Sequence, residues 1–202
     1  MPSEPLPTVR VAILVFPGVE ELDFAGFLEV LTVANRVRGR AHFETELVGT
    51  EPSPIRCRGG LRIIPDRVLP NLSDHDLLFM PGGGAKSETG VDLLMKNGDV
   101  LELLRKSHAS GKRVWSVCTG ALVLGAAGLL KGRRATTHHL YYDSIRAAGA
   151  EVVHDRVVRE GTITTGGGIS SSIDVGLALV EDELGKDVRR EVQAAMEYPP
   201  AQ

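Results

Sequence analysis

The stretch Lys112-Arg113-Val114-Trp115-Ser116-Val117-Cys118-Thr119-Gly120 decides the fold of this chain. Its first part, up to Val117, predicts a strand buried in a sheet. The small and apolar residues that follow, Ala121–Ala127, predict a helix, and Gly128 is the residue expected to end it. A strand that runs straight into a helix indicates an α/β fold.

Cys118 stands at the junction between that strand and that helix. Ser116 lies two residues before it and Gly120 two residues after it. This spacing is typical of a nucleophile elbow, in which a sharp turn tolerates only small flanking residues and pushes the nucleophile out of the sheet. We therefore expect a nucleophile elbow at Cys118.

The alternation of strand and helix continues on both sides of this stretch. Val9–Phe16 and Asp76–Met80 are apolar runs that end at Pro-Gly, a pattern typical of strands buried on both faces of a parallel sheet. Helical spacing follows them at Glu20–Arg36 and Val100–His108. Further strands are expected at 42–49, 152–158 and 162–165, a short hairpin at 55–64, and further helices at 138–148, 173–184 and 188–196. These elements predict a three-layer α/β/α sandwich around a mostly parallel sheet.

Length and composition indicate a globular protein. With 202 residues, 43% of them apolar, we expect a single domain over residues 1–202 with flexible tails at 1–8 and 199–202. The net charge of −3 argues against nucleic acid as a partner. The run Ala121–Leu130 is far shorter than the roughly 20 residues of a membrane helix, so we expect no membrane association. The N-terminus lacks the features of a secretory signal, which predicts a cytoplasmic protein.

The chemistry of an open α/β sheet is expected where its parallel strands end, because the carboxyl ends of the strands share one edge. The segments that follow the expected strands are 17–23, 81–86, 118–120 and 165–172. We therefore expect these four segments to meet around one site.

Cys118 is the candidate nucleophile in this set. A thiol at a helix N-terminus is exposed to the positive end of the helix dipole, which favours the reactive thiolate. The alternative is a buried cysteine that acts as a small hydrophobic side chain. Cys57, which lies between Arg56 and Arg58 on the expected hairpin, is interpreted as inert, and both cysteines are expected to be free.

Asp23 is the candidate proton-transfer partner. It follows Glu20 and Glu21 at the end of the first expected strand, among apolar neighbours. A buried acid at this place could be protonated or hydrogen-bonded to a thiolate. The alternative is a helix N-cap, a position that aspartate favours.

Two glycine triplets, Gly82–Gly84 and Gly166–Gly168, complete the expected site. Their backbone amides could form an anion nest or an oxyanion hole, or the triplets could be tight turns only. The first triplet is no phosphate loop, because Ala85 stands where such a loop needs glycine. The neighbours His138 and His139 lack the spacing of a zinc site, so we expect no metal and no cofactor. Either His139 or Tyr142 could line the pocket.

Taken together, the motifs resemble the ThiJ/PfpI superfamily and, within it, the isonitrile hydratase group. The resemblance covers nearly the whole chain, and Ser-Val-Cys-Thr-Gly followed by Ala-Thr-Thr-His is its specific part. The matching stretches are Phe16–Asp23, Met80–Gly83, Ser116–Leu130, Arg134–His138 and Val152–Asp174.

The resemblance implies a flavodoxin-like sandwich and a homodimer with its site near the interface. It implies that Cys118 attacks the terminal carbon of an isonitrile and that hydration gives an N-substituted formamide. Asp23 would be the acid or base that protonates the bound carbon and handles water. The small-molecule substrate would be bound by Gly83, Gly84, Thr119 and Ile169, with the amides around Gly83 and Thr119 stabilising charge and Ile169 packing near the thiol.

The sequence also departs from the patterns of related families. Phe27 follows Gly26 where the family often has proline, and Ser171-Ser172 replaces a smaller pair, which bears on substrate size. Thr119 stands where the protease-like branch has histidine, which argues against a Cys-His peptidase. Residues 166–174 contain no histidine, which argues against a glutamine amidotransferase.

Two other functions remain open. AraC-family regulators carry a similar domain as a ligand sensor, although no helix-turn-helix is expected before Gln202. Cys118 could also respond to oxidants or electrophiles, or detoxify a small carbonyl compound.

Overall fold

The computed structural model describes residues 7–69, 72, 74–85 and 89–199. The expected tails at 1–8 and 199–202 lie almost entirely outside the described residues, as does Lys86 at the end of one expected strand-end segment. The helices are α1 (Glu21–Arg38), α2 (Val91–Leu94), α3 (Gly98–Ala109), α4 (Gly120–Ala126), the 3-10 helix η1 (His139–Tyr141), α5 (Tyr142–Ala147) and α6 (Ser171–Ala195). The strands are β1 (Val9–Val15), β2 (Phe43–Gly49), β3 (Ile55–Arg56), β4 (Arg62–Ile63), β5 (Arg67–Val68), β6 (Leu77–Met80), β7 (Arg113–Val117), β8 (Arg134–Ala135), β9 (Glu151–Val152), β10 (Val157–Glu160) and β11 (Ile163–Gly166).

The central sheet holds seven strands among the described residues, in the order β10-β11-β7-β6-β1-β2-β5. β10 runs antiparallel to β11, and the other neighbouring strands run parallel. The chain moves from β1 outward to β2 and then returns to the other side of β1 with β6. Such a reversal of strand order opens a crevice at the carboxyl ends of the strands, here between β1 and β6.

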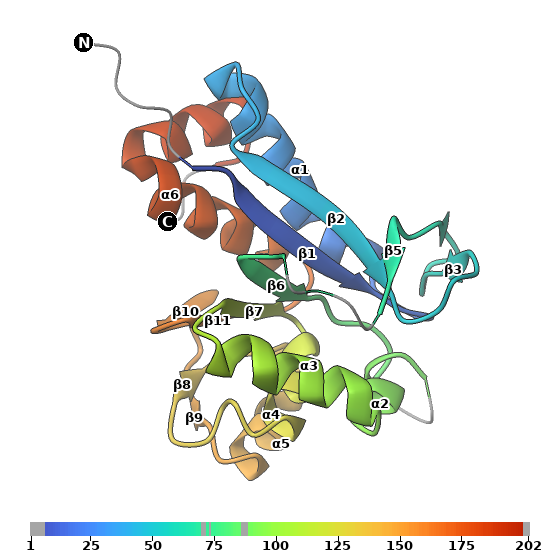
Figure 1. Ribbon diagram of the computed structural model, residues 1–202. Helices are drawn as coiled ribbons and strands as arrows, with labels where there is room; N and C mark the ends of the chain where they lie inside the picture. Colours follow the sequence, from blue (N-terminus) through green and yellow to red (C-terminus); the bar gives the residue numbers. More distant parts are fainter. Residues whose placement is uncertain (1–6, 70–71, 73, 86–88, 200–202) are drawn as a thin grey trace.

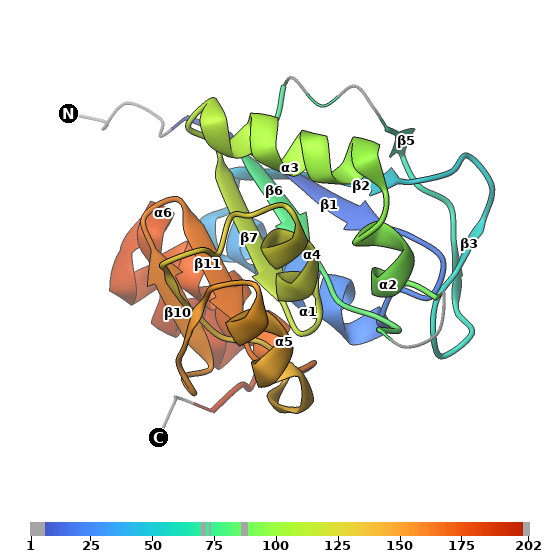
Figure 2. The same cartoon turned by 90° about the horizontal axis from the view of Figure 1, so that it is seen from below.

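Helices cover both faces of this sheet, which confirms the expected three-layer α/β/α sandwich. Figure 1 shows α1 and α6 together on one side of the sheet and α3 and α4 on the other, and Figure 2 shows the same layers from below. The phenyl ring of Phe27 on α1 stacks on that of Phe79 on β6, with 3.8 Å between ring centroids. Both rings are fully buried, so Phe27 packs in the core beneath the site and does not face a ligand.

The long apolar elements match their predictions, and the short ones do not. The strand expected at 152–158 is wrong, because β9 ends at Val152 and β10 begins only at Val157. The helix expected at 138–148 is a 3-10 turn followed by the short helix α5. The sequence prediction missed α2, β5 and β8, each of two to four residues.

The last helix contains the break that the sequence predicted between 184 and 188. Gly185 has φ 86° and ψ 169° inside α6, a backbone conformation that side chains with a Cβ rarely adopt. None of the helices among the described residues has both the length and the apolarity needed to span a membrane.

Candidate functional site

The site lies where three neighbouring parallel strands end. β1 leads to Asp23 on α1, β6 leads to Gly82, and β7 leads to Cys118. The backbone N–H of Gly82 donates a 2.7 Å hydrogen bond to Oδ2 of Asp23. The Asp23 carboxyl and the Cys118 thiol lie close enough that each shifts the pKa of the other. The structure thus brings together the two residues that the sequence singled out.

Cys118 occupies a strained turn. Its φ of 55° is positive, which non-glycine residues seldom adopt and which is typical of functional sites held by their surroundings. Its N–H donates to the carbonyl oxygens of Gly166 (3.1 Å) and Gly167 (2.8 Å). Its own carbonyl oxygen accepts a 2.7 Å hydrogen bond from Oγ1 of Thr137. These bonds fix the backbone of Cys118 from both sides of the turn.

Gly120 allows this turn to pack against β6. A Cβ on Gly120 would lie 2.3 Å from the carbonyl oxygen of Met80, which is far inside van der Waals contact with backbone. The small residue expected two positions after the nucleophile is therefore a steric requirement.

The surroundings of the Cys118 thiol act on its pKa in two directions. Burial raises its pKa to about 12, and the negative charge of Asp23 adds to the effect. The backbone N–H groups of Ile169 and Thr119 are directed at the sulfur and oppose this rise. The Thr119 amide at the start of α4 thus favours the thiolate, as expected from the sequence, while burial and the nearby carboxylate oppose it.

The carboxyl of Asp23 is fully buried, in the first turn of α1. Burial raises its pKa from 3.8 to about 7, and the charge of Glu20 raises it further. The Gly82 N–H, the Cys118 thiol and the positive charge of Arg58 act in the opposite direction. Oδ1 has no hydrogen-bond partner among the described residues. The N-cap position belongs to Glu20, so the capping interpretation of Asp23 is wrong.

The first glycine triplet has no amide left to bind a ligand. The N–H of Gly82 donates to Asp23, that of Gly83 to Oγ1 of Thr119 (2.9 Å), and that of Gly84 to the carbonyl oxygen of Gly18 (3.2 Å). The expectation that Gly83 helps to stabilise charge is therefore wrong for this state of the site. The amides of Thr119 and Ile169, which face the sulfur, take that place.

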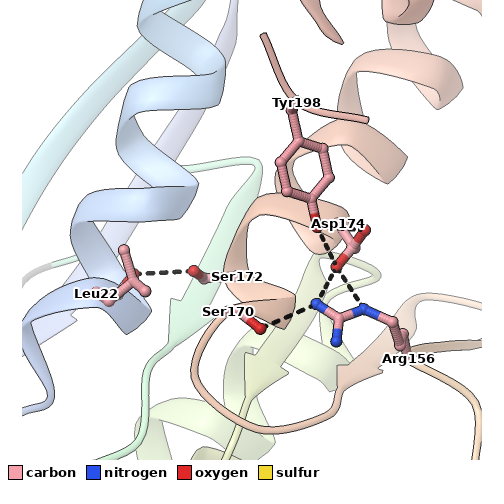
Figure 3. A network of polar contacts seen from close by, with 6 residues as sticks. All are labelled: Leu22, Arg156, Ser170, Ser172, Asp174 and Tyr198. Carbon is pink, nitrogen blue, oxygen red and sulfur yellow. Dashed lines mark hydrogen bonds and ion pairs between the residues drawn. The ribbon is translucent and has the colours of Figure 1, made fainter. Parts of the chain in front are cut away.

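The second glycine triplet is held by the network in Figure 3. The N–H of Gly167 donates to the carbonyl oxygen of Arg156. The guanidinium of Arg156 binds Asp174 of α6 and Oγ of Ser170, and the hydroxyl of Tyr198 binds Asp174 from the C-terminal side. This network fixes both ends of the loop that supports Cys118.

The serine pair at the start of α6 joins that helix to α1. Oγ of Ser172 donates to the carbonyl oxygen of Leu22, one residue before Asp23 (Figure 3). A Cβ on Gly26 would lie 2.4 Å from Oγ of Ser172. Ser172 therefore acts on the packing of α1 against α6, and through Leu22 on the position of Asp23.

Three residues near the site were not singled out from the sequence. Thr137 binds the backbone of Cys118, Arg58 acts on the charge of Asp23, and the ring of His138 lies 2.7 Å from the place a Cβ on Gly168 would occupy. Thr137 and His138 belong to the Ala-Thr-Thr-His stretch, the signal that could have found them. His139 and Tyr142, expected as possible pocket residues, do not line the cavity beside the site, whereas Leu140 and Tyr141 do.

Cys57 is buried and also lines that cavity. Burial raises the pKa of its thiol to about 11. Neither cysteine forms a disulfide. Among the described residues, no group of three or more histidine, cysteine, aspartate or glutamate side chains is arranged to hold a metal ion.

Known proteins share this arrangement of strands and the sequence around it. The chain is 39% identical over 193 residues to the isonitrile hydratase of Pseudomonas putida, covering 96% of this chain and 80% of that protein. It is 28% identical over 156 residues to a glutathione-independent glyoxalase of Caenorhabditis elegans, covering 76% of this chain and 80% of that protein. The crystal structure of a THiJ/PfpI family protein from Pseudomonas syringae superposes with a TM-score of 0.81 at 29% identity, covering 100% of this chain and 83% of the other. Residues 9–182 match the DJ-1/PfpI family, and the chain belongs to that family.

Proposed function

We propose that this protein is a cysteine-dependent hydratase that adds water to an isonitrile and releases an N-substituted formamide. The observation that carries the proposal is the buried pair of Asp23 and Cys118, a proton acceptor with a pKa of about 7 beside a neutral thiol. A group whose pKa lies near the working pH is suited to both accept and donate a proton. The 39% identity to an isonitrile hydratase supports the choice of reaction.

The first half of the reaction forms a bond between sulfur and carbon. The Sγ–H bond of Cys118 breaks, its proton passes to the Asp23 carboxylate, and sulfur bonds to the terminal carbon of the isonitrile. Asp23 then gives the proton to that carbon, which leaves a thioimidate with the grouping S–CH=N. The amides of Ile169 and Thr119 stabilise the negative charge on sulfur during the attack.

The second half adds water and breaks that bond. Water attacks the thioimidate carbon, and Asp23 transfers one of its protons to the nitrogen. The C–S bond of the resulting tetrahedral intermediate breaks as the C=O bond forms, and the hydroxyl proton returns through Asp23 to sulfur. The net change is one isonitrile and one water consumed for one formamide.

We also propose that the protein works as a homodimer. Leu22 on α1 and Leu61 on the turn between β3 and β4 leave apolar side chains 42% and 52% exposed. The N–H of Leu61 donates to Oε1 of Glu21, the residue next to Leu22, so the two leucines lie on neighbouring parts of the surface. An apolar patch at this place, beside the site, suits a contact between two copies.

The test is turnover of phenyl isonitrile by the wild-type protein and by three variants, with the formamide product quantified. Cys118→Ala and Asp23→Asn should each lose at least about a hundredfold in kcat, because each removes a group that acts on the reacting carbon. Asp155→Asn is the control, since it makes the same carboxylate-to-amide change as Asp23→Asn at an exposed position that lines no part of the cavity, and it should keep wild-type turnover.

Absence of formamide with the wild-type protein would overturn the proposal. Turnover that persists in Cys118→Ala would overturn the role of the thiol. Conversion of an α-oxoaldehyde in the absence of any isonitrile turnover would instead favour the chemistry named for the glyoxalase relative, at the same cysteine.

A further inference from the structure

A cavity of about 710 Å³ lies beside the Asp23 and Cys118 pair and is not used by the reaction steps above. Its lining includes residues of the β3–β4 hairpin, of α2 and of η1. Ligand pockets in proteins typically measure about 300–1,000 Å³, so this cavity has room for a substituent much larger than an isonitrile group.

The cavity adjoins the reacting pair through shared backbone. Gly84 lines it and follows Gly83, whose N–H binds Thr119. Gly18 also lines it and accepts a hydrogen bond from Gly84. Arg58 is a third lining residue, and its positive charge lowers the pKa of Asp23 and of His138. Neither Asp23 nor Cys118 lines the cavity, but the backbone segments that hold them do adjoin it.

One wall of the cavity is apolar and holds Leu93, Leu140 and Tyr141. The leucines are 49% and 72% exposed, so apolar surface is open to a ligand on this part of the lining. A hydrophobic body of aryl or branched alkyl type would cover them.

The part of the lining that comes from the β3–β4 hairpin carries positive charge. Arg56 and Arg58 line it, and no aspartate or glutamate does so among the described residues. Glu20 lies 3.3 Å from the guanidinium of Arg58. The guanidinium of Arg56 has no ion pair or hydrogen bond with the described part of the chain. A positive wall in a protein with a net charge of −3 favours an anion at this place.

We propose that this cavity binds the substituent of the substrate, and that the substituent is an apolar body carrying a carboxylate that pairs with Arg56. The inference rests on the proposed function for the identity of the reacting group. The size and charge preference of the cavity is a separate property and is tested separately below. Arginine suits this role because its planar guanidinium binds a carboxylate through two hydrogen bonds.

The experiment compares phenyl isonitrile with 4-isocyanobenzoate, which has the same body and adds a carboxylate. Wild-type protein should prefer the carboxylate in kcat/KM. Arg56→Gln should reduce kcat/KM for 4-isocyanobenzoate by about tenfold, mainly through KM, and leave phenyl isonitrile within about twofold. Arg62→Gln is the matched control. Arg62 stands opposite Arg56 in the register of β3 and β4 but does not line the cavity. This variant should change kcat/KM for neither substrate.

A second pair of reagents makes the test independent of hydration. N-phenyl iodoacetamide and 4-(iodoacetamido)benzoate alkylate thiols, and peptide mass spectrometry separates Cys118 from Cys57. The ratio of the two alkylation rates at Cys118 should favour the carboxylate in wild type and fall about tenfold in Arg56→Gln only. A fall in this ratio without any isonitrile turnover would overturn the proposed function and retain the cavity's preference.

Two results would overturn the inference. One is an equal effect of Arg56→Gln on the carboxylate and neutral members of both pairs. The other is an effect of Arg62→Gln as large as that of Arg56→Gln, which would indicate general electrostatics in place of a binding contact.

Discussion

Gly82 of the triplet at 82–84 directs its N–H toward the site, whereas Gly166 and Gly167 of the triplet at 166–168 direct carbonyl oxygens toward it. Gly82 donates to the Asp23 carboxyl, and Gly166 and Gly167 accept from the N–H of Cys118. Each triplet therefore holds one member of the reacting pair. The first triplet binds the Asp23 side chain and affects its charge. The second triplet binds the Cys118 backbone and affects its conformation.

This difference decides what each triplet contributes to the chemistry. A donor to a carboxylate lowers its pKa, so Gly82 limits the rise that burial causes at Asp23. An acceptor for the N–H of Cys118 holds that residue at its positive φ without touching the sulfur. The two triplets thus teach that similar glycine-rich sequences can control charge in one place and geometry in another.

The largest effect is expected from removing the charge that the first triplet holds. The raised pKa of Asp23 means that the folded state binds its proton more tightly than the unfolded state does. The stability that Asp23 contributes should therefore be present at about pH 4 and be lost as pH rises to about 7, a change of roughly 4 kcal/mol for this group. Asp23→Asn keeps an acceptor for Gly82 and lacks this penalty, so it should be more stable than wild type at pH 8 and equal to it near pH 4.

Urea denaturation at several pH values between 4 and 8 measures this difference. Asp155→Asn is the control, since it makes the same carboxylate-to-amide change at an exposed position. A constant gap between Asp23→Asn and wild type over this range would show that the Asp23 charge does not oppose folding.

The next effect comes from the close packing of the first triplet. A Cβ on Gly83 would lie 2.4 Å from the carbonyl oxygen of Gly18, and this backbone atom cannot move aside locally. A Cβ on Gly84 would meet only a side-chain oxygen, Oγ1 of Thr89, at 2.8 Å. Gly83→Ala should cost about 3 kcal/mol in the free energy of unfolding, and Gly84→Ala less than about 1 kcal/mol. Equal costs in denaturation experiments would mean that the triplet packs as a unit.

Much of this arrangement follows from the sequence. The apolar runs of β1 and β7 and the small residues around Cys118 predict the strands, the elbow and the meeting of Asp23 with Cys118. Long apolar segments are predictable because burial dominates their choice of structure. The same reasoning identified both glycine triplets as parts of the site.

The sequence does not predict which way a peptide group points. Glycine permits many backbone conformations, so its presence does not say whether its N–H or its C=O faces the site. The rise in the pKa of Cys118 could not be predicted for a related reason, because burial and the charge of Asp23 depend on the folded whole. Thr137 follows β8, a strand of two residues, which is too short to produce a periodic pattern.

The smallest effect is expected at Thr137, which holds the backbone of Cys118 as the second triplet does. Its hydroxyl donates to the carbonyl oxygen of Cys118, and both residues are buried. Thr137→Val removes the shorter of two hydrogen bonds to that carbonyl oxygen, which also accepts one from the N–H of Ala121 at 3.4 Å, and should cost about 1 kcal/mol in the free energy of unfolding. Thr136 provides a closely matched control, since it is equally buried and its Oγ1 has no hydrogen-bond partner among the described residues. Thr136→Val should therefore be neutral or stabilising, because it removes a buried polar atom that makes no hydrogen bond.

If both variants lost the same stability, the cost would come from the change of shape, and the hydroxyl of Thr137 would not hold the strained turn at Cys118. A loss in Thr137→Val alone, together with a lower rate of alkylation at Cys118, would show that the geometry of the nucleophile depends on this one hydrogen bond.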